Sequence, residues 1–341
     1  MNVRGKKIFV GLSGGVDSAV TAALVQKAGA EVTGVFIKGW YPPELPCTWR
    51  EDRRDAMRVA AHLSIPFVTL DASAEYKKGV IDYLIREYRE GRTPNPDIMC
   101  NREVKFGAFF DFAMSHGADS IATGHYARSE NGKLLRGVDP SKDQSYFLWN
   151  IPSHTLAKTI FPVGGIKKEQ VRVLAKKFKL PVAEKKDSQG ICFLGAVSVE
   201  DFLRAELGSV PGTAVDETGK EVGTHNGVLL YTLGERVSLP NGPWYVREKH
   251  IKENMLAVSN TRLTADRETH SLRIADTNFF SEPPTGELTA EYRYHGEKIS
   301  GRFDSGQNIF IPLTPLNETP ASGQSLVLYH NDEVLGGGIL I

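Results

Sequence analysis

The feature that most constrains the fold is a regular alternation of short apolar runs with amphipathic stretches. The apolar runs predict strands at 7–12, 31–37, 66–70 and 120–123. Stretches with helical spacing lie between them, including 51–62, 75–90 and 102–116. Strands that alternate with helices form right-handed crossovers, which build a parallel sheet covered on both faces. The first part of the chain is therefore predicted to be an α/β domain.

The sequence pattern changes twice in the remainder of the chain. Asn131-Gly132 between polar and apolar arms predicts a hairpin, and 153–207 has the spacing of short helices. From about 209 onward Gly, Pro, Thr and Val become frequent and short alternating strands follow one another. We predict a domain at 1–208 whose part from about 153 to 208 is helical, a small β domain at 209–265 and a barrel-like β domain at 266–341.

Charge and cysteine content exclude several classes of protein. The 341 residues carry 41 Lys and Arg against 41 Asp and Glu, so a nucleic-acid site has to be a local patch. The cysteines are Cys47, Cys100 and Cys192, and the odd count without a C-x-x-C pair argues against a disulfide framework, an iron–sulfur cluster or a structural zinc site. With no apolar run near the roughly 20 residues that span a bilayer, we expect a cytoplasmic protein without a membrane partner.

A Gly/Ser turn directly after the first strand predicts a phosphate-binding loop. Gly14 and Gly15 allow backbone N–H groups to turn inward, and the helix that follows directs its N-terminal N–H groups to the same place. No Gly-Lys-Ser/Thr follows, so the loop is not a Walker A motif. An ordinary turn with a serine cap is the alternative, and we favour phosphate binding. The predicted nucleotide contacts are Gly11, Leu12, Ser13, Gly14, Gly15, Val16, Asp17, Ser18, Ile37 and Gly124, the last two lying at the carboxyl ends of later strands.

Two of the cysteines have sequence surroundings typical of reactive thiols. Cys100 follows a loop stiffened by two prolines and is expected at or near the start of the 102–116 helix, where the helix and Arg102 favour the thiolate. Asp97 lies three residues earlier and could move a proton. Cys192 follows Gly190 and two lysines. A buried, inert thiol is the alternative for any cysteine and the one we favour for Cys47, whereas we expect Cys100 and Cys192 to be exposed.

A basic run precedes Cys192. Residues 158–186 contain nine Lys and Arg but only two Glu. A solvated helix face is the usual explanation of such a run. Because this one leads into Cys192, we favour a surface that binds nucleic-acid phosphates.

Taken together, six motifs resemble the tRNA-specific 2-thiouridylase (MnmA) family. They lie at 13–18, 91–101, 122–126, 142–147, 186–193 and 336–339, and both their order and their length match. The resemblance covers essentially the whole chain. It implies a parallel-sheet ATP pyrophosphatase domain, Rossmann-like and of the adenine nucleotide alpha hydrolase kind, followed by two small β modules.

The resemblance also implies a reaction. ATP, with Mg²⁺, adenylates O2 of the wobble uridine of tRNAs for Lys, Glu and Gln, and sulfur then displaces AMP from C2. The sulfur is a persulfide on Cys192, supplied by a cysteine desulfurase or a persulfide relay protein, with Cys100 as the partner thiol and Asp97 as the acid or base. The resemblance places the target base against Asn95, Pro96 and Asp97, and other tRNA contacts at His125, Lys142, Asp143, Gln144, Tyr292, Arg293 and Gln324. We predict no metal-binding cluster of protein side chains.

Two other functions remain open from the sequence. A ligase of the same superfamily that acts on a small molecule needs the phosphate-binding loop but neither cysteine. A non-catalytic tRNA-binding relative needs neither motif, although both are intact here. Enzymes that make 2-thiocytidine are disfavoured because no C-x-x-C pair is present, and those that make 4-thiouridine because no additional RNA-binding domain precedes the first strand.

Overall fold

The N-terminal part of the chain folds around a five-stranded parallel sheet. The computed structural model describes residues 2–42, 49–186, 198–261, 271–317 and 319–341. The strand order is β3–β2–β1–β4–β7, and all four pairings are parallel. The strands are β1 (Lys7–Gly11), β2 (Glu31–Lys38), β3 (Phe67–Asp71), β4 (Ser120–Ala122) and β7 (Thr159–Ile160). The predicted α/β parallel-sheet class is confirmed.

Helices cover both faces of this sheet because successive strand residues point to opposite sides. Ile8 and Val10 of β1 pack in one buried cluster, and Phe9 between them packs in the other. The Ile8 side is covered by α1 (Val16–Lys27), α2 (Trp49–Leu63) and α8 (Lys168–Lys177). The Phe9 side is covered by two long broken helices: α3 (Ser73–Tyr76), η1 (Lys77–Ile81) and α4 (Asp82–Arg89), then α5 (Pro96–Met99), η2 (Cys100–Ala108) and α6 (Phe109–Ser115).

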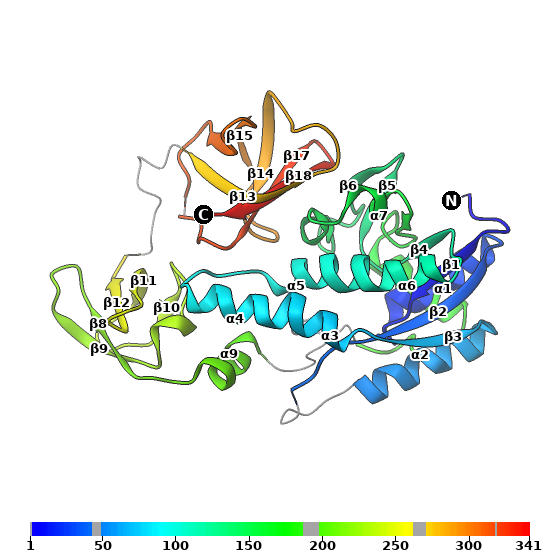
Figure 1. The fold of residues 1–341 in the computed structure, drawn as a ribbon, viewed down its shortest axis with the longest axis horizontal. Helices are drawn as coiled ribbons and strands as arrows, with labels where there is room; N and C mark the ends of the chain where they lie inside the picture. Colours follow the sequence, from blue (N-terminus) through cyan, green and yellow to red (C-terminus); the bar gives the residue numbers. More distant parts are fainter. Residues whose placement is uncertain (1, 43–48, 187–197, 262–270, 318) are drawn as a thin grey trace.

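The second of these broken helices runs without interruption from 96 to 115, and we call it the 96–115 helix. Its middle section, η2, is π-helical. Figure 1 shows it crossing the middle of the molecule, with its C-terminal end at the parallel sheet and its N-terminal end near the two β domains. The helix therefore links the two halves of the protein.

Shorter elements complete this part of the chain. The hairpin predicted at Asn131-Gly132 is present, with both turn residues at positive φ as a two-residue type I′ turn requires. Its strands are β5 (Ala127–Glu130) and β6 (Lys133–Arg136), followed by η3 (Ser145–Leu148), α7 (Ser153–Leu156) and α9 (Val199–Leu207). No helix in the described ranges combines the length and apolarity that a membrane span needs.

A five-stranded sheet in the order β10–β11–β12–β8–β9 follows. Its elements are β8 (Gly212–Val215), β9 (Glu221–His225), η4 (Val228–Leu230), β10 (Arg236–Val237), β11 (Trp244–His250) and β12 (Met255–Ser259). Trp244, Val246, Leu256 and Val258 from two neighbouring strands form much of its small core. It is a separate sheet with a core of its own.

The C-terminal strands close into a six-stranded barrel. They pair in the order β13–β16–β15–β14–β17–β18, and β18 pairs back to β13. The strands are β13 (Leu272–Phe279), β14 (Glu287–Glu291), β15 (Ile299–Asp304), β16 (Ile309–Pro312), β17 (Ser325–His330) and β18 (Glu333–Leu340). β6 also pairs with β18, which joins the N-terminal hairpin to the barrel (Figure 1).

A buried charged group reinforces this junction. Arg136 at the end of β6 donates to Glu291 Oε1 at 2.8 Å and to Asp143 Oδ2 at 3.2 Å, and its guanidinium lies 3.6 Å from the ring centroid of Tyr329. The three charged side chains are at most 13% exposed. Two buried carboxylates thus share one cation, and Asp143 also accepts hydrogen bonds from the backbone N–H groups of Gly137 and Ser145.

We expect Arg136→Met to lower the free energy of unfolding by about 3–5 kcal/mol, because it leaves Glu291 and Asp143 buried without their cation. Urea or calorimetric unfolding measures this loss. The matched control is Lys133→Met in the same strand as Arg136. It removes a surface ion pair with Glu333 of β18 and should lower the free energy of unfolding by less than about 1 kcal/mol. Equal effects of the two substitutions would contradict this account of the junction.

Candidate functional site

Residues 13–18 form a closed, hydrogen-bonded turn that follows β1 and includes the first three residues of α1, and we call it the phosphate cup. Ser18 Oγ donates to the carbonyl of Gly15 at 3.1 Å and accepts from the backbone N–H of Ser13 at 3.2 Å. Gly14 has a φ of +78°, and a Cβ there would collide with the carbonyl of Asp52. No side chain caps the start of α1 at Gly15. The uncapped N–H groups give the cup the character of an anion site.

Asp17 is the carboxylate of the cup, and two side chains from later in the chain hold it. Lys168 Nζ lies 2.8 and 2.9 Å from its two oxygens, and the hydroxyl of Tyr126 donates to Oδ1 at 2.7 Å. Neither partner was singled out for this site from the sequence. Both belong to segments far from Asp17 along the chain, and no local motif reports such a contact.

The other predicted nucleotide contacts gather at the edge of the sheet where the cup lies. Gly11 ends β1 beside Val35 of β2, and Ile37 follows two residues later, 8% exposed. Gly124 follows β4, and a Cβ on it would lie 2.8 Å from the backbone nitrogen of Ser18. Carboxyl ends of parallel strands are where open α/β sheets bind ligands. The structure thus brings these residues together, while their roles toward a nucleotide stay predictions.

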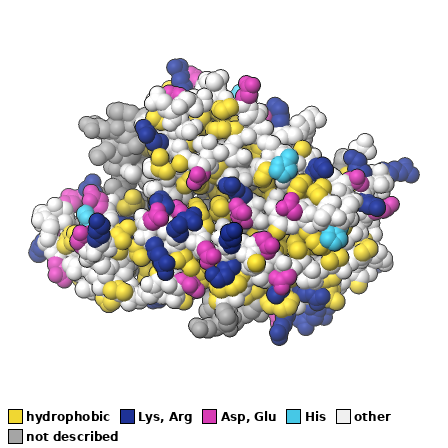
Figure 2. Space-filling view, in the orientation of Figure 1, with side chains coloured by type: hydrophobic (Ala, Val, Ile, Leu, Met, Phe, Trp, Pro, Cys, Tyr) yellow, Lys and Arg dark blue, Asp and Glu magenta, His cyan; other side chains and the backbone are white. Residues whose placement is uncertain are grey.

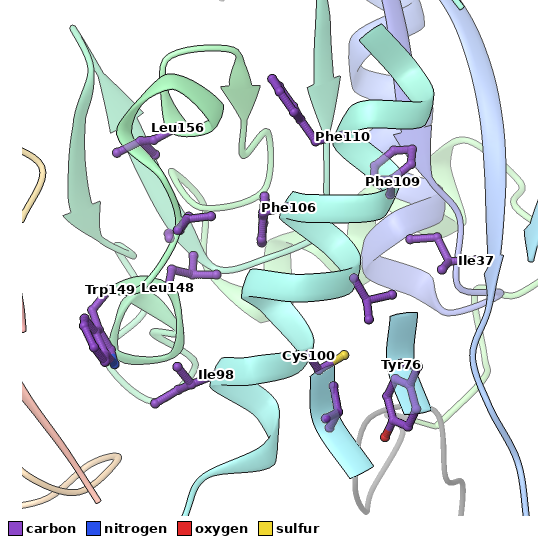
Figure 3. Close-up of a cluster of buried hydrophobic side chains, with 14 of the residues drawn as sticks. Ile37, Tyr76, Ile98, Cys100, Phe106, Phe109, Phe110, Leu148, Trp149 and Leu156 are labelled. Atoms are coloured by element: carbon purple, nitrogen blue, oxygen red, sulfur yellow. The ribbon is translucent and has the colours of Figure 1, made fainter. Parts of the chain in front are cut away.

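The structure corrects the expected environment of Cys100. The helix begins at Pro96 rather than 102, because Asn95 accepts the Asp97 N–H at 3.0 Å as an N-cap and proline suits the first helical position. Cys100 therefore lies in the second turn, and it is 1% exposed rather than exposed. Figure 3 shows its sulfur on the side of the helix where Tyr76 lies, among buried apolar side chains.

Cys192 and Cys47 lie outside the described residues, as does most of the 186–193 motif. The expectation that Cys100 and Cys192 meet beside the nucleotide stays a prediction.

Three contacts along the 96–115 helix connect predicted site segments. Asn101 Nδ2 donates to the carbonyl of Phe147 at 3.0 Å, and Lys105 Nζ lies 3.4 Å from Nε2 of His125. Phe109 lies against Gly11, where even a methyl group on the glycine would touch its ring at 3.6 Å. Cys100 and Phe109 lie nine positions apart along this helix. One helix therefore carries Cys100 and packs against the end of β1, just before the phosphate cup.

His125 is enclosed between this helix and β4. Its Nδ1 lies 2.8 Å from Thr123 Oγ1, and its ring packs against Phe106 and Phe161. Burial, together with the nearby charge of Lys105, holds the pKa of His125 well below its ordinary value of 6.5. The ring is neutral at pH 7, so Nε2 accepts from Lys105 and Nδ1 donates to Thr123.

The loop at 91–95 is held by both β domains. The Thr93 N–H donates to the carbonyl of Ser322 at 2.8 Å, and Gln324 Nε2 donates to the carbonyl of Thr93 at 2.6 Å. The Thr93 hydroxyl also lies 3.4 Å from that of Thr232 in the central domain. All three parts of the chain thus meet at Thr93, two residues before the N-cap of the 96–115 helix. Gln324, a predicted tRNA contact, is here a contact to that loop.

The remaining predicted tRNA contacts fall into two neighbouring groups. Asp143 is 7% exposed and accepts from backbone N–H groups at 2.9 and 3.1 Å, so it shapes its own loop. Gln144 is tied to the backbone of Tyr126. Phe147 packs 4.4 Å from Tyr294, which places the 142–147 segment beside Arg293 and Tyr292. Tyr292 is 5% exposed and Arg293 is exposed.

Three of the nine cations in the basic run at 158–186 are partly buried and bind other groups of the protein, which leaves fewer for nucleic-acid phosphates. Lys168 is paired with Asp17, Lys185 lies 2.8 Å from Asp52 and from Asp55, and Arg172 donates to two backbone carbonyls. These cations hold the fold together. The other six cations are exposed: Lys158, Lys167, Lys176, Lys177, Lys179 and Lys186. Figure 2 shows Lys and Arg interspersed with Asp and Glu over the face it presents, so no single basic field dominates that face.

We expect protonation of His125 to oppose folding. Its folded pKa lies below 6.5, so the unfolded chain takes up a proton as the pH falls through that value while the folded chain does not, and the free energy of unfolding decreases. Melting temperatures between pH 7 and pH 5 should therefore fall less steeply for His125→Gln than for the unaltered protein. Parallel pH profiles for the two proteins would show that the buried imidazole is not responsible.

Comparisons with known proteins find matches along nearly the whole chain. Family models match at 6–196 (tRNA methyl transferase HUP domain), 200–260 (tRNA methyl transferase PRC-barrel domain) and 269–340 (Aminomethyltransferase beta-barrel domain). The tRNA-specific 2-thiouridylase MnmA of Streptococcus agalactiae serotype Ia is 40% identical over 98% of this chain and 95% of its own. The tRNA-specific 2-thiouridylase MnmA of Chromobacterium violaceum is 44% identical over 98% of this chain and 92% of its own. The chain belongs to the tRNA-specific 2-thiouridylase family.

Proposed function

We propose that this protein catalyses the ATP-dependent 2-thiolation of the wobble uridine of tRNA. Relatives named as tRNA-specific 2-thiouridylases, which align with nearly the whole chain, support the reaction class. The observation that carries the proposal is the 96–115 helix, which bears Cys100 and Asp97 near one end and packs through Phe109 against Gly11, two residues before the phosphate cup. This contact supports a proposal in which the nucleotide binds next to the element that carries the thiol.

The first half of the reaction is activation of the base. O2 of uridine attacks the α-phosphorus of ATP, the bond between the α- and β-phosphates breaks, and pyrophosphate leaves. The N–H groups of the cup hold the pyrophosphate portion. The C2–O2 bond, which is otherwise hard to break, now joins C2 to an AMP leaving group. The base is flipped out of the anticodon loop to reach Asn95, Pro96 and Asp97, with Asp97 managing its proton.

In the second half, sulfur replaces the O2 oxygen. The terminal sulfur of a Cys192 persulfide attacks C2, AMP departs with the oxygen, and Cys100 attacks Cys192 Sγ to release 2-thiouridine and leave a disulfide. In the alternative order, Cys100 attacks the persulfide first and the released hydrosulfide attacks C2. Both orders end with a Cys100–Cys192 disulfide that a cellular thiol reduces. Because Cys100 is 1% exposed, we propose that substrate binding uncovers it.

The chain fits a Mg²⁺ ion that arrives with ATP. Mg²⁺ commonly takes one or two carboxylates together with substrate phosphates, and Asp17 is the carboxylate in the cup. Within the described ranges there is no group of three or more His, Cys, Asp or Glu residues able to hold a metal by itself. When bound, the ion neutralises charge on the departing pyrophosphate.

We propose that tRNA lies across the two aromatic and basic segments that Phe147 and Tyr294 bring together, near Lys142 and Arg293. Asp143 and Gln144 fix the 142–147 segment through hydrogen bonds to the backbone, and His125 is proposed as a further tRNA contact. The acceptors are tRNAs for Lys, Glu and Gln. The sulfur donor is a cysteine desulfurase or a persulfide relay protein, and the reaction takes place in the cytoplasm.

Nucleoside mass spectrometry tests the activity. The protein is incubated with unmodified tRNA, ATP, Mg²⁺ and a sulfide source, and the digest is examined for 2-thiouridine. AMP formed in step with thiolation supports the proposal. Unchanged uridine alongside turnover of a small molecule would favour a ligase instead, and bound tRNA without conversion of ATP to AMP would favour a non-catalytic binding protein.

Substitution of the cysteines tests sulfur transfer. Cys100→Ser and Cys192→Ser should each lower 2-thiouridine formation by roughly 100-fold or more, because serine neither carries a persulfide nor forms the disulfide. Cys47→Ser is the matched control and should retain thiolation. Full activity of either the Cys100 or the Cys192 variant with a persulfide donor would contradict the proposed roles.

Substitution of Gly124 tests the nucleotide site. Gly124→Ala places a methyl group 2.8 Å from Ser18 N, which pushes β4 away from the start of α1 and opens the cup. ATP binding measured by calorimetry should weaken by roughly tenfold for each hydrogen bond lost. Gly165→Ala is the control, since a Cβ there meets nothing within 4 Å. ATP affinity that is the same in both variants would place the nucleotide elsewhere.

A further inference from the structure

The ion pair between Asp17 and Lys168 has no part in the proposed reaction as described so far. Lys168 Nζ lies 2.8 and 2.9 Å from the two Asp17 oxygens, and the Tyr126 hydroxyl occupies Oδ1 at 2.7 Å. The Lys168 side chain is 12% exposed and that of Asp17 is 30% exposed. An ammonium is therefore held against the wall of the cup rather than in solvent.

The backbone of Lys168 is fixed independently of this pair. Its N–H donates to Asp139 Oδ2 at 3.0 Å at the start of α8. Val171 and Ala175, later in α8, are fully buried in the cluster that also contains the α1 side chains. The lysine thus extends from an anchored base toward the cup, unlike exposed Lys177 and Lys179 farther along the chain.

The charge balance of the cup explains why a cation is needed there. The N-terminus of α1 contributes only about half a positive charge, and the loop has no Walker lysine. Asp17 adds a negative charge at the place where a polyphosphate would bind. In the structure the ammonium of Lys168 is paired with that carboxylate and offsets its charge.

We propose that Lys168 is a phosphate-binding residue of the ATP site. In the empty cup its ammonium is held by Asp17. When ATP binds, the ammonium exchanges Asp17 for oxygens of the pyrophosphate portion, and Asp17, still held by Tyr126, turns to the cation that accompanies ATP. This inference rests on the proposed function, since it requires the cup to bind ATP. No covalent bond changes in the exchange.

A purely structural role is the competing explanation, in which the ion pair only joins α8 to α1. The two explanations differ in their ligand dependence. A phosphate-binding lysine contributes to pyrophosphate and ATP binding but not to binding of adenosine. A lysine with a purely structural role contributes to thermal stability. Its removal changes the affinities for all three ligands equally, or changes none of them.

The test is calorimetric titration of the full chain with inorganic pyrophosphate, ATP and adenosine, without tRNA. Lys168→Met should weaken pyrophosphate and ATP binding by roughly 10- to 100-fold and leave adenosine binding unchanged. Lys168→Arg should recover part of the loss. The matched control is Lys77→Met, which removes an exposed lysine that is also paired at 2.8 Å, with Asp82, and should change neither affinity.

A second variant keeps the test decisive if Lys168→Met folds poorly. In Mg²⁺-free buffer Asp17→Asn should strengthen pyrophosphate binding, because it removes the negative charge and releases the ammonium. A purely structural role predicts weaker binding instead, and that result would overturn the inference, as would wild-type pyrophosphate affinity in a folded Lys168→Met protein. Failure of the unaltered protein to bind either ATP or pyrophosphate would count against the proposed ATP site itself.

Discussion

The site depends on one element, the 96–115 helix, being held in a single position from several sides. Asn101 binds the carbonyl of Phe147, Lys105 contacts His125, and Phe109 packs under Gly11. A helix fixed at three successive levels cannot rotate or slide without breaking buried contacts. Cys100 is consequently positioned by the same packing that holds the helix against Gly11 at the end of β1.

The β domains act on this helix through the loop before it. Thr93 is bonded to Ser322 and Gln324 of the C-terminal part and lies beside Thr232 of the central one. The barrel in turn is joined to the first domain by the β6–β18 pairing and by Arg136. The barrel is therefore fixed at two separate places, and these contacts determine its position relative to the loop at 91–95.

The sequence was sufficient for the parts of the fold that depend on local chemistry. Alternating strands and helices, the Gly/Ser turn and the Asn131-Gly132 hairpin each follow from backbone preferences of the residues concerned, and the structure contains them. The predicted start of the 96–115 helix, at 102, is six positions too late. The two-proline segment reads as a loop, but Pro96 occupies the first helical position. The burial of Cys100 was missed for the same reason.

Contacts between distant segments could not be read from the sequence in the same way. A strand pattern shows that β6 pairs with its hairpin partner β5, but nothing in it identifies β18 as its other neighbour. Likewise a cluster of lysines indicates a basic surface, whereas the structure uses Lys185 and Lys168 to neutralise Asp52, Asp55 and Asp17. Charge pairing depends on which helices meet, and that is a property of the packed chain.

Two routes of hydrogen bonds connect the 139–144 loop to the cup. Asp139 holds the backbone of Lys168, whose ammonium reaches Asp17, and Gln144 holds the backbone of Tyr126, whose hydroxyl reaches the same carboxylate. Both routes end on one side chain. A displacement of this loop, which is where the family resemblance places tRNA, therefore has to break one of these bonds or move a partner of Asp17. The carboxylate of Asp17 is in this way the point where the proposed nucleotide site and the proposed tRNA surface share a structural constraint.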